Sequence, residues 1–306
     1  MLFDQITLVE GAQFANLTVA TGTSFPASPS AGELFYRTDL TLLHVYDGSS
    51  WTEVGAGSGG GSAGDAYFNQ TSLLLNFAGT NATQRTYDAS VRLNTLTFGS
   101  GNSTISSTQS KFGGTSLFLN NASGSSPGYV STTANTVASS GLDLSTQAPD
   151  WTVEAWAYPT ALPSLSNELS GTVIGWGGGF GAGWASVSIL IKPSGVWQGQ
   201  WNNANSAGGD VSINGSAVTL NSWVHLAVSK SDGTIRFFIN GTLQGSSTTN
   251  TNNYFSSSPW RVGAGVNDTY RFIGYVDDVR VTKGVARYTA TFTAPTEANP
   301  TFQSNS

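Results

Sequence analysis

The chain has 306 residues, of which 10% are charged and 11% are aromatic, and it contains no cysteine. Low charge combined with many aromatic residues excludes intrinsic disorder, and the lack of cysteine excludes disulfides and thiolate metal sites. The formal net charge is -6, and no basic cluster that could neutralise phosphates is present, so we expect no nucleic-acid partner.

Targeting signals are also missing from the sequence. Residues 1–7 lack the basic start and the continuous apolar stretch of a signal peptide. No apolar run approaches the ~18–20 residues that cross a bilayer. We therefore expect a protein that folds in a reducing cytoplasm and does not insert into a membrane.

Residues 1–54 are predicted to form a small, acidic N-terminal β-hairpin module. Strands are expected at 33–38 and 42–47, and Asp47-Gly48 is a turn signal after which Trp51 packs back onto the hairpin. A two-stranded unit is marginal in water. We expect other copies of the module, or a partner protein, to stabilise it.

Residues 55–64 consist only of glycine, alanine and serine. Such a stretch has no side chains to pack and high backbone entropy, so it is predicted to be a flexible linker. Its expected root-mean-square length is about 17 Å on the scaling for glycine-rich chains.

Residues 65–296 are predicted to form an all-β domain, and residues 297–306 a C-terminal tail. No segment has sustained helical periodicity, whereas short alternating runs recur between clusters of glycine, asparagine and serine. The predicted strands lie near 72–77, 115–120, 128–131, 151–158, 172–176, 186–191, 196–201, 222–229, 234–240, 260–263 and 272–282.

The last predicted strand carries an acidic residue among apolar ones. Strict alternation places Asp277 on the same face as Tyr275 and Val279, and Asp278 on the opposite face. A buried carboxylate must be satisfied by backbone N–H groups, by an arginine or by a cation. Asp277 is therefore expected either to tie down a loop or to help bind Ca²⁺, with Asp268 and Asp210 as co-ligands. No other cofactor is expected.

Four segments carry a family resemblance, in this order: 73–79, 151–159, 223–241 and 271–296. The last contains Val-Asp-Asp-Val-Arg-Val, Lys-Gly-Val-Ala-Arg-Tyr and Phe-Thr-Ala-Pro-Thr. The set resembles the laminin-G-like, concanavalin A-like jelly-roll domains found in many bacteriophage virion proteins. Residues 29–51 are similar to a short motif repeated in phage tail-fibre and related structural proteins. The resemblance implies a C-terminal jelly-roll β-sandwich behind the N-terminal module.

One set of predicted outward-facing residues on neighbouring strands mixes aromatic rings with hydrogen-bonding groups. It comprises Glu154, Trp156, Trp223, His225 and Arg236. Such a surface suits sugar, whose C–H faces stack on rings and whose hydroxyls need polar partners. The alternative is structural, with Glu154 paired to His225 or Arg236 inside a packed layer.

A second candidate ligand site comprises the glycine-rich segment 175–184 and the strand face that carries Trp197 and Trp201. Tryptophans on such a loop often mark recognition of a ring-shaped ligand. The predicted binding residues are Trp176, Trp184, Trp197, Trp201, Asn202 and Asn203. The alternative is that Trp176 and Trp184 cap the ends of the sandwich core.

The residues that catalysis would need are not arranged for it. Retaining glycosidases use two carboxyls about 5–5.5 Å apart, but Glu154, Glu168 and Glu297 are isolated in the sequence. No Gly-x-Ser-x-Gly elbow is present, and His225 lies in the middle of a predicted strand. We expect that the chain is not an enzyme.

Together these features predict a phage virion structural protein, of tail-fibre or capsid-decoration type. Residues 1–54 would attach to other phage proteins, and the jelly roll would bind a glycan of the host surface. A homo-oligomer is expected, a trimer by analogy with fibre proteins. The alternative is a purely structural decoration or tail component, and the third reading is a glycan-degrading enzyme.

Overall fold

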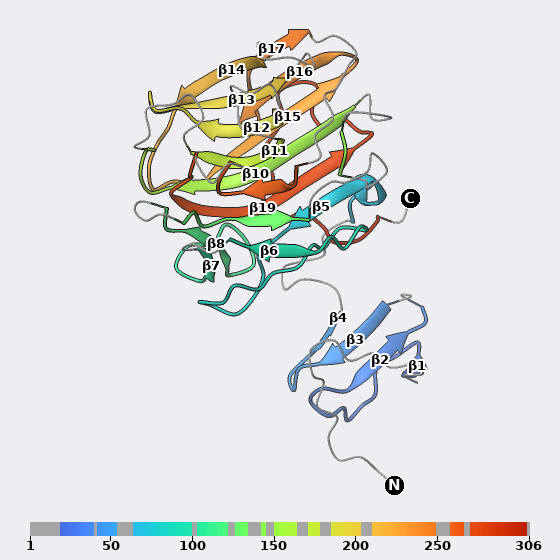
Figure 1. Cartoon of the computed structure of the whole chain (residues 1–306). Coiled ribbons are helices and arrows are strands. Elements are labelled where there is room, and N and C mark those ends of the chain that lie inside the picture. Colours follow the sequence, from blue (N-terminus) through green and yellow to red (C-terminus); the bar gives the residue numbers. More distant parts are fainter. Residues whose placement is uncertain are drawn as a thin grey trace. The chain divides into compact units, whose positions relative to one another are not determined.

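The computed structural model describes residues 19–39, 42–53, 64–99, 103–121, 126–133, 142–144, 150–163, 171–177, 185–202, 210–248, 258–265 and 270–304. The chain divides into two compact units, Met1–Gly61 and Ser62–Ser306, and this division falls inside the predicted linker (Figure 1). The only helix in the described residues is the short 3-10 turn η1 (Phe68–Gln70). No helix there is long and apolar enough to cross a membrane.

The first unit is a single sheet with strand order β1-β2-β3-β4. The antiparallel strands β2 (Leu34–Arg37) and β3 (Leu42–Tyr46) confirm the predicted hairpin. The sheet is extended by β4 (Trp51–Glu53) on one side and by β1 (Ala20–Gly22), which is parallel to β2, on the other.

Aromatic packing holds the first unit together. Phe25 stacks on Trp51 with ring centroids 4.8 Å apart and also contacts Phe35 and His44. The Arg37 guanidinium lies 4.6 Å above the Phe25 ring. Phe35, at 6% exposed, is the only buried apolar side chain in the described part of this unit, so the described residues form only a very small core.

The predicted turn at Asp47-Gly48 joins β3 to β4. The Asp47 carboxylate accepts backbone N–H groups from Ser49 and Ser50, and Gly48 has a φ of 102°. These hydrogen bonds lower the pKa of Asp47 to about 2. The turn therefore has the side-chain-to-backbone bonding that makes aspartate and glycine a turn signal.

The second unit contains two sheets, whose strands lie in two layers (Figure 1). We call the first the β10 sheet. Its strands, in spatial order, are β17 (Thr242–Thr248), β16 (Thr234–Ile239), β15 (Val224–Ser231), β10 (Trp151–Pro159), β19 (Gly274–Lys283), β8 (Ser116–Leu119) and β7 (Ser103–Ser106), and β5 (Thr71–Leu75) also pairs with β19.

We call the second the β12 sheet. Its strands, in spatial order, are β14 (Asp210–Ala217), β13 (Val196–Asn202), β12 (Ala185–Ile191), β11 (Thr172–Gly177), β18 (Trp260–Val262), β9 (Val130–Thr132) and β6 (Leu96–Phe98). Every pairing in both sheets of this unit is antiparallel.

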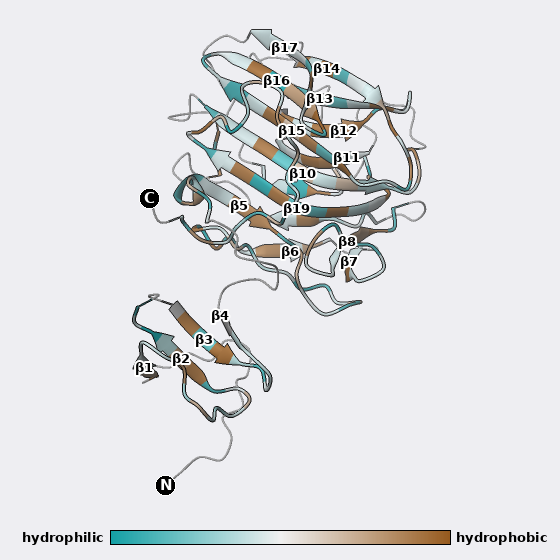
Figure 2. Cartoon of the chain, turned by 180° about the vertical axis from the view of Figure 1, so that it is seen from behind, coloured by the Kyte–Doolittle hydropathy of each residue, from teal (hydrophilic) through white to brown (hydrophobic). Residues whose placement is uncertain are grey.

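The core lies between the two sheets. Apolar and polar segments alternate along β10, β15, β16 and β19 (Figure 2), and Val153, Ala155 and Ala157 of β10 belong to one buried cluster with residues of the β12 sheet. Gly199 of β13 is so close to β16 that an added Cβ would lie 2.9 Å from the Phe237 ring. The all-β sandwich predicted from the sequence is therefore confirmed.

The predicted alternation of β19 is wrong because the strand contains a bulge. The pairing of β10 with β19 shifts register between Glu154 and Trp156, and Asp278 has a φ of 48°. An extra residue in one strand reverses which side chains face the core. Val276 and Val279 are both in the core cluster, so Asp277 lies on the outer face rather than on the apolar one.

The domain continues past its predicted end at residue 296. Phe292 N–H donates to Gly241 O, Asn299 N–H donates to the Asp278 carboxylate, and Gln303 forms a β-bridge with Asp65. We call residues 284–304 the C-terminal segment. It lies against the outer face of the β10 sheet, so the expected tail begins inside the folded domain.

Candidate functional site

The predicted tryptophan site is wrong for the three tryptophans that the structure describes. Trp176, Trp197 and Trp201 are 1%, 2% and 2% exposed and belong to the core cluster. Trp176 stacks on Trp260 with centroids 5.7 Å apart. This agrees with the alternative that Trp176 closes the core. Indole rings sealed between two sheets cannot stack on an external sugar.

The other three residues predicted for that site are described only in part or not at all. Trp184 and Asn203 are not among the described residues, and Asn202 is placed only by its backbone at the end of β13. Strand alternation explains the burial of the other rings. Along β13, Trp197 and Trp201 point inward while Gln198 and Gln200 point outward, because burying the indoles removes more apolar surface from water.

Glu154 is at the centre of a buried ion-pair network on the outer face of the β10 sheet. Its Oε2 lies 3.1 Å from His225 Nε2, and its Oε1 accepts from Arg280 Nε at 2.7 Å. Burial alone would raise the pKa of Glu154, but the Arg280 charge and the His225 hydrogen bond outweigh it and hold the pKa well below its usual range. The predicted pairing with His225 is confirmed, whereas Arg236 bonds to Thr234 O instead.

The C-terminal segment seals this network from outside. Tyr288 Oη donates to Glu154 Oε2 at 2.7 Å, and the Tyr288 ring stacks on Phe292 with centroids 3.6 Å apart. Arg287 and Arg280 both bind Asp65, at 2.6 and 3.2 Å. Buried charges that are paired in this way are structural, so this half of the outer face is closed to a ligand.

Asp277 and Asp278 hold two loops. Oδ2 of Asp277 accepts the backbone N–H groups of Lys111 and Phe112 at 2.9 and 3.1 Å. The Asp278 carboxylate accepts the N–H of Asn299 at 3.0 Å. The prediction that Asp277 ties down a loop is confirmed.

The alternative Ca²⁺ site gains no support from this geometry. Within the described residues, no group of three acidic, histidine or cysteine side chains could hold a metal ion. The proposed co-ligand Asp268 lies outside the described residues, as does the side chain of Asp210.

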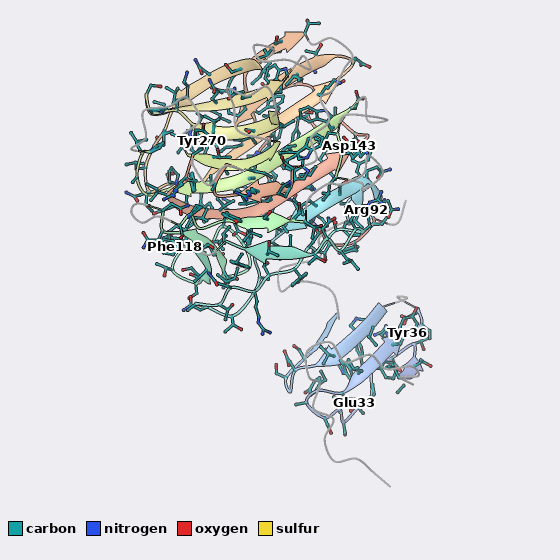
Figure 3. All side chains as sticks on the ribbon, in the orientation of Figure 1. Glu33, Tyr36, Arg92, Phe118, Asp143 and Tyr270 are labelled. Carbon is teal, nitrogen blue, oxygen red and sulfur yellow. The ribbon has the colours of Figure 1, made fainter. Side chains whose placement is uncertain are left out.

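The other half of the same face carries a line of aromatic side chains. Phe118 of β8, Tyr275 of β19 and Tyr158 of β10 lie opposite one another in the strand register. Trp223, immediately before β15, continues the line. Successive ring centroids are 4.8, 5.8 and 5.5 Å apart. We call these four residues the aromatic row; Phe118 is labelled in Figure 3.

The aromatic row reaches the surface. Phe118, Tyr158 and Trp223 are half-buried, and only Tyr275, between two of them, is buried at 8% exposed. Burial raises the pKa of Tyr275 despite its hydrogen bond with Thr108. The rings can stack on apolar C–H faces, and the two tyrosine hydroxyls can donate and accept hydrogen bonds.

Sequence reasoning placed Trp223 on the outer face but missed its neighbours. Phe118 and Tyr158 are visible in the sequence as aromatic residues within predicted strands. Their meeting depends on which strands are neighbours, since β8, β19 and β10 are far apart in the chain. No local pattern reveals that pairing.

The outer face of the β12 sheet is polar instead. Ser188, Gln200 and Ser212 lie opposite one another on β12, β13 and β14. Gln200 Oε1 has no hydrogen-bond partner although it is buried. Ser188 and Gln200 are both buried, and Ser212 is exposed.

Comparison with solved structures finds a similar fold in a binding domain of another protein. The binding domain of Paraclostridial Mosquitocidal Protein 1 is 15% identical with a TM-score of 0.51, covering 71% of this chain and 49% of that one. The Botulinum Neurotoxin serotype G binding domain is 16% identical with a TM-score of 0.49, covering 70% of this chain and 47% of that one. The chain thus spans about half the length of these neighbours, and at such identities the likeness concerns the fold alone.

A third similar structure is domain 4 of AbnA, a GH43 extracellular arabinanase from Geobacillus stearothermophilus, in complex with arabinotriose. It is 17% identical with a TM-score of 0.47, covering 71% of this chain and 94% of that one. No curated protein matches the chain. Residues 123–287 match the model of the concanavalin A-like lectin/glucanases superfamily. Because this match covers more than half of the sequence, the chain belongs to the concanavalin A-like lectin/glucanase superfamily.

Proposed function

We propose that the second unit binds carbohydrate and that the aromatic row is the surface that contacts the sugar. The observation that carries this proposal is the line of four rings, with three of them half-exposed. Phe118, Tyr275 and Tyr158 lie on three neighbouring strands, and Trp223 lies immediately before a fourth. Membership of a superfamily that includes lectins supports the proposal, but the argument rests on the rings.

The physical case for a glycan is the mixed character of the row. Its rings offer apolar faces, and the Tyr158 and Tyr275 hydroxyls offer polar atoms at the same level. Neighbouring strands lie about 4.8 Å apart, so a row that crosses the strands gives successive stacking positions along an extended ligand. Aromatic side chains held in a sheet lose little conformational entropy on binding.

We further propose that the chain is a phage virion structural protein, of tail-fibre or capsid-decoration type, that attaches to the host surface. This rests on the resemblance of residues 29–51 and 271–296 to phage structural proteins. Residues 1–54 would bind other virion proteins and would form a homo-oligomer, a trimer by analogy with fibres. Several weak sites on one particle gain avidity through effective concentration.

The alternative is a structural decoration or tail component without a ligand. One observation favours it: the C-terminal segment already covers the Glu154 half of the outer face of the β10 sheet. A glycan-degrading enzyme has less support, because Glu154, Asp277 and Asp278 are buried and engaged in hydrogen bonds.

The test is glycan-array and host-cell binding by the full chain and by Tyr158→Ala and Trp223→Ala. Losing one stacking ring should weaken binding by about 5–30-fold, or roughly 1–2 kcal/mol. Tyr87→Ala is the matched control, because Tyr87 is 57% exposed and lies outside the row. Equal binding by all variants refutes the row as the site. Absence of binding to any host envelope fraction favours the structural alternative.

A further inference from the structure

A positive charge lies on the same face of the sheet as the aromatic row. Lys111 is half-buried, and its Nζ lies 3.9 Å from the ring centroid of Trp156. Trp156 is on the outer face of β10, two residues before Tyr158. Because a strand rises about 3.4 Å per residue, Trp156 lies about 7 Å along β10 from Tyr158, and the ammonium group contacts Trp156 on the same side of the sheet.

The backbone around Lys111 is fixed. Asp277 accepts the N–H groups of both Lys111 and Phe112. On either side, Ser110 Oγ bonds to Phe112 O and Thr115 O, and Ser116 Oγ bonds to Gln109 O. The Phe112 ring meets Trp156 edge-on with centroids 5.9 Å apart. The lysine is therefore held in place before any ligand arrives, which lowers the entropic cost of using it.

The ammonium has contacts with rings but no carboxylate partner among the described residues. Its two contacts are with the Trp156 and Phe112 rings. Asp277 and Glu154, on the same face of the sheet, are buried and already accept other hydrogen bonds. In a chain of net charge -6, a cation that is kept unpaired next to a stacking surface can serve an anionic ligand group.

We infer that the glycan bound by the aromatic row carries an anionic group, a carboxylate or a phosphate, which Lys111 binds. This inference rests on the proposed carbohydrate function and adds the substrate class. The rings would hold the sugar, and Lys111 would select acidic over neutral saccharides. An ion pair in this half-exposed setting contributes modestly, so we expect a preference of about fivefold.

The experiment measures the affinity of the full chain for a neutral oligosaccharide, for the same oligosaccharide with uronic acid units, and for a phosphorylated form. The wild type should bind at least one acidic form about fivefold more tightly, and the preference should fall as salt is raised. The two acidic arms identify which anion is recognised.

Three variants test whether Lys111 is the cause of the preference for acidic ligands. Lys111→Gln should abolish the preference while neutral binding stays unchanged, and Lys111→Arg should keep the preference. Lys192→Gln, which removes a half-buried lysine after β12 on the other sheet, should have no effect. Equal binding of acidic and neutral ligands by the wild type, or a preference that survives Lys111→Gln, overturns the inference.

The same variants also show whether the carbohydrate-binding proposal itself fails. If Tyr158→Ala leaves the binding of all three ligands unchanged, the aromatic row is not the site and both proposals fall. If Tyr158→Ala weakens all of them while Lys111→Gln changes none, the carbohydrate site stands and only the anionic substrate class is refuted.

Discussion

Asp278 shows how strongly this fold perturbs a single carboxyl group. Burial raises the pKa of Asp278 to about 7, although the Asn299 N–H and the Arg280 charge act in the opposite direction. The folded state therefore binds this proton more tightly than the unfolded state does, where the pKa is near 3.8. The free energy of unfolding should consequently fall as the pH rises from about 4 to about 7.

Asp278→Asn removes the free-energy cost of ionising this buried carboxyl group. The amide oxygen of asparagine can still accept the Asn299 N–H, and asparagine tolerates the left-handed φ of 48° at this position. We expect the variant to be more stable than the wild type at pH 8, by up to about 4 kcal/mol. The gain should nearly vanish near pH 4, where Asp278 is neutral in the folded wild type and only about half ionised in the unfolded chain. Urea unfolding at pH 4, 6 and 8 measures the gain in the free energy of unfolding. A gain that does not change with pH would mean that it does not come from the ionisation of Asp278.

At the scale of single elements, the C-terminal segment is the feature with the clearest test. Gly241 has a φ of 77°, and an added Cβ there would overlap the carbonyl oxygen of Phe292. The Phe292 N–H donates to Gly241 O, so the two backbones must be in direct contact. Any side chain at position 241 should push the segment off the sheet.

We therefore expect Gly241→Ala to cost about 2–4 kcal/mol and to raise the protease sensitivity of residues 284–304. Gly113→Ala is the matched control: Gly113 also has a left-handed φ, of 66°, but nothing lies within 4 Å of its added Cβ. The control should lose only about 1 kcal/mol, the cost of the backbone strain. Equal losses in the two variants would mean that the segment does not depend on this contact.

The strands themselves were largely predictable, because alternation and turn residues are local signals. The strands missed in the second unit include β14 and β17, which are rich in serine, threonine and glycine and lie at sheet edges. Such strands have few apolar residues to reveal them. The bulge at Asp278 and the covering of Glu154 by Tyr288 depend on tertiary pairing, and strict alternation could not show either.

The dependence on tertiary pairing also explains why the sequence did not reveal the aromatic row as the candidate site. A tryptophan that alternates with glutamine, as Trp201 does with Gln200, indicates a buried ring, and the sequence contained that signal. The aromatic row could not be found in this way. It is assembled from residues 118, 158, 223 and 275 by strand order alone, and strand order is a property of the whole sheet.

For the molecule as a whole, the described residues of the first unit form too small a core to be stable by themselves. Leu34 and Tyr36 of β2 lie opposite Val45 and Leu43 of β3 on one face of its sheet, and all four are half-buried; Tyr36 is labelled in Figure 3. With Phe35 as the only buried apolar residue described, we expect association with further copies, or with a partner protein, to supply the missing stability.

Sedimentation of the full chain should therefore show an oligomer that dissociates in Tyr36→Lys. Placing a charge in an apolar contact between copies costs far more than placing one at a solvated position. Tyr87→Lys is the control, because Tyr87 is 57% exposed in the second unit and the change in charge is the same. Because avidity requires linked sites, the dissociated variant should also lose cell binding while its affinity for a soluble oligosaccharide is unchanged. A monomeric wild type, or an oligomer that survives Tyr36→Lys, contradicts assembly through this face.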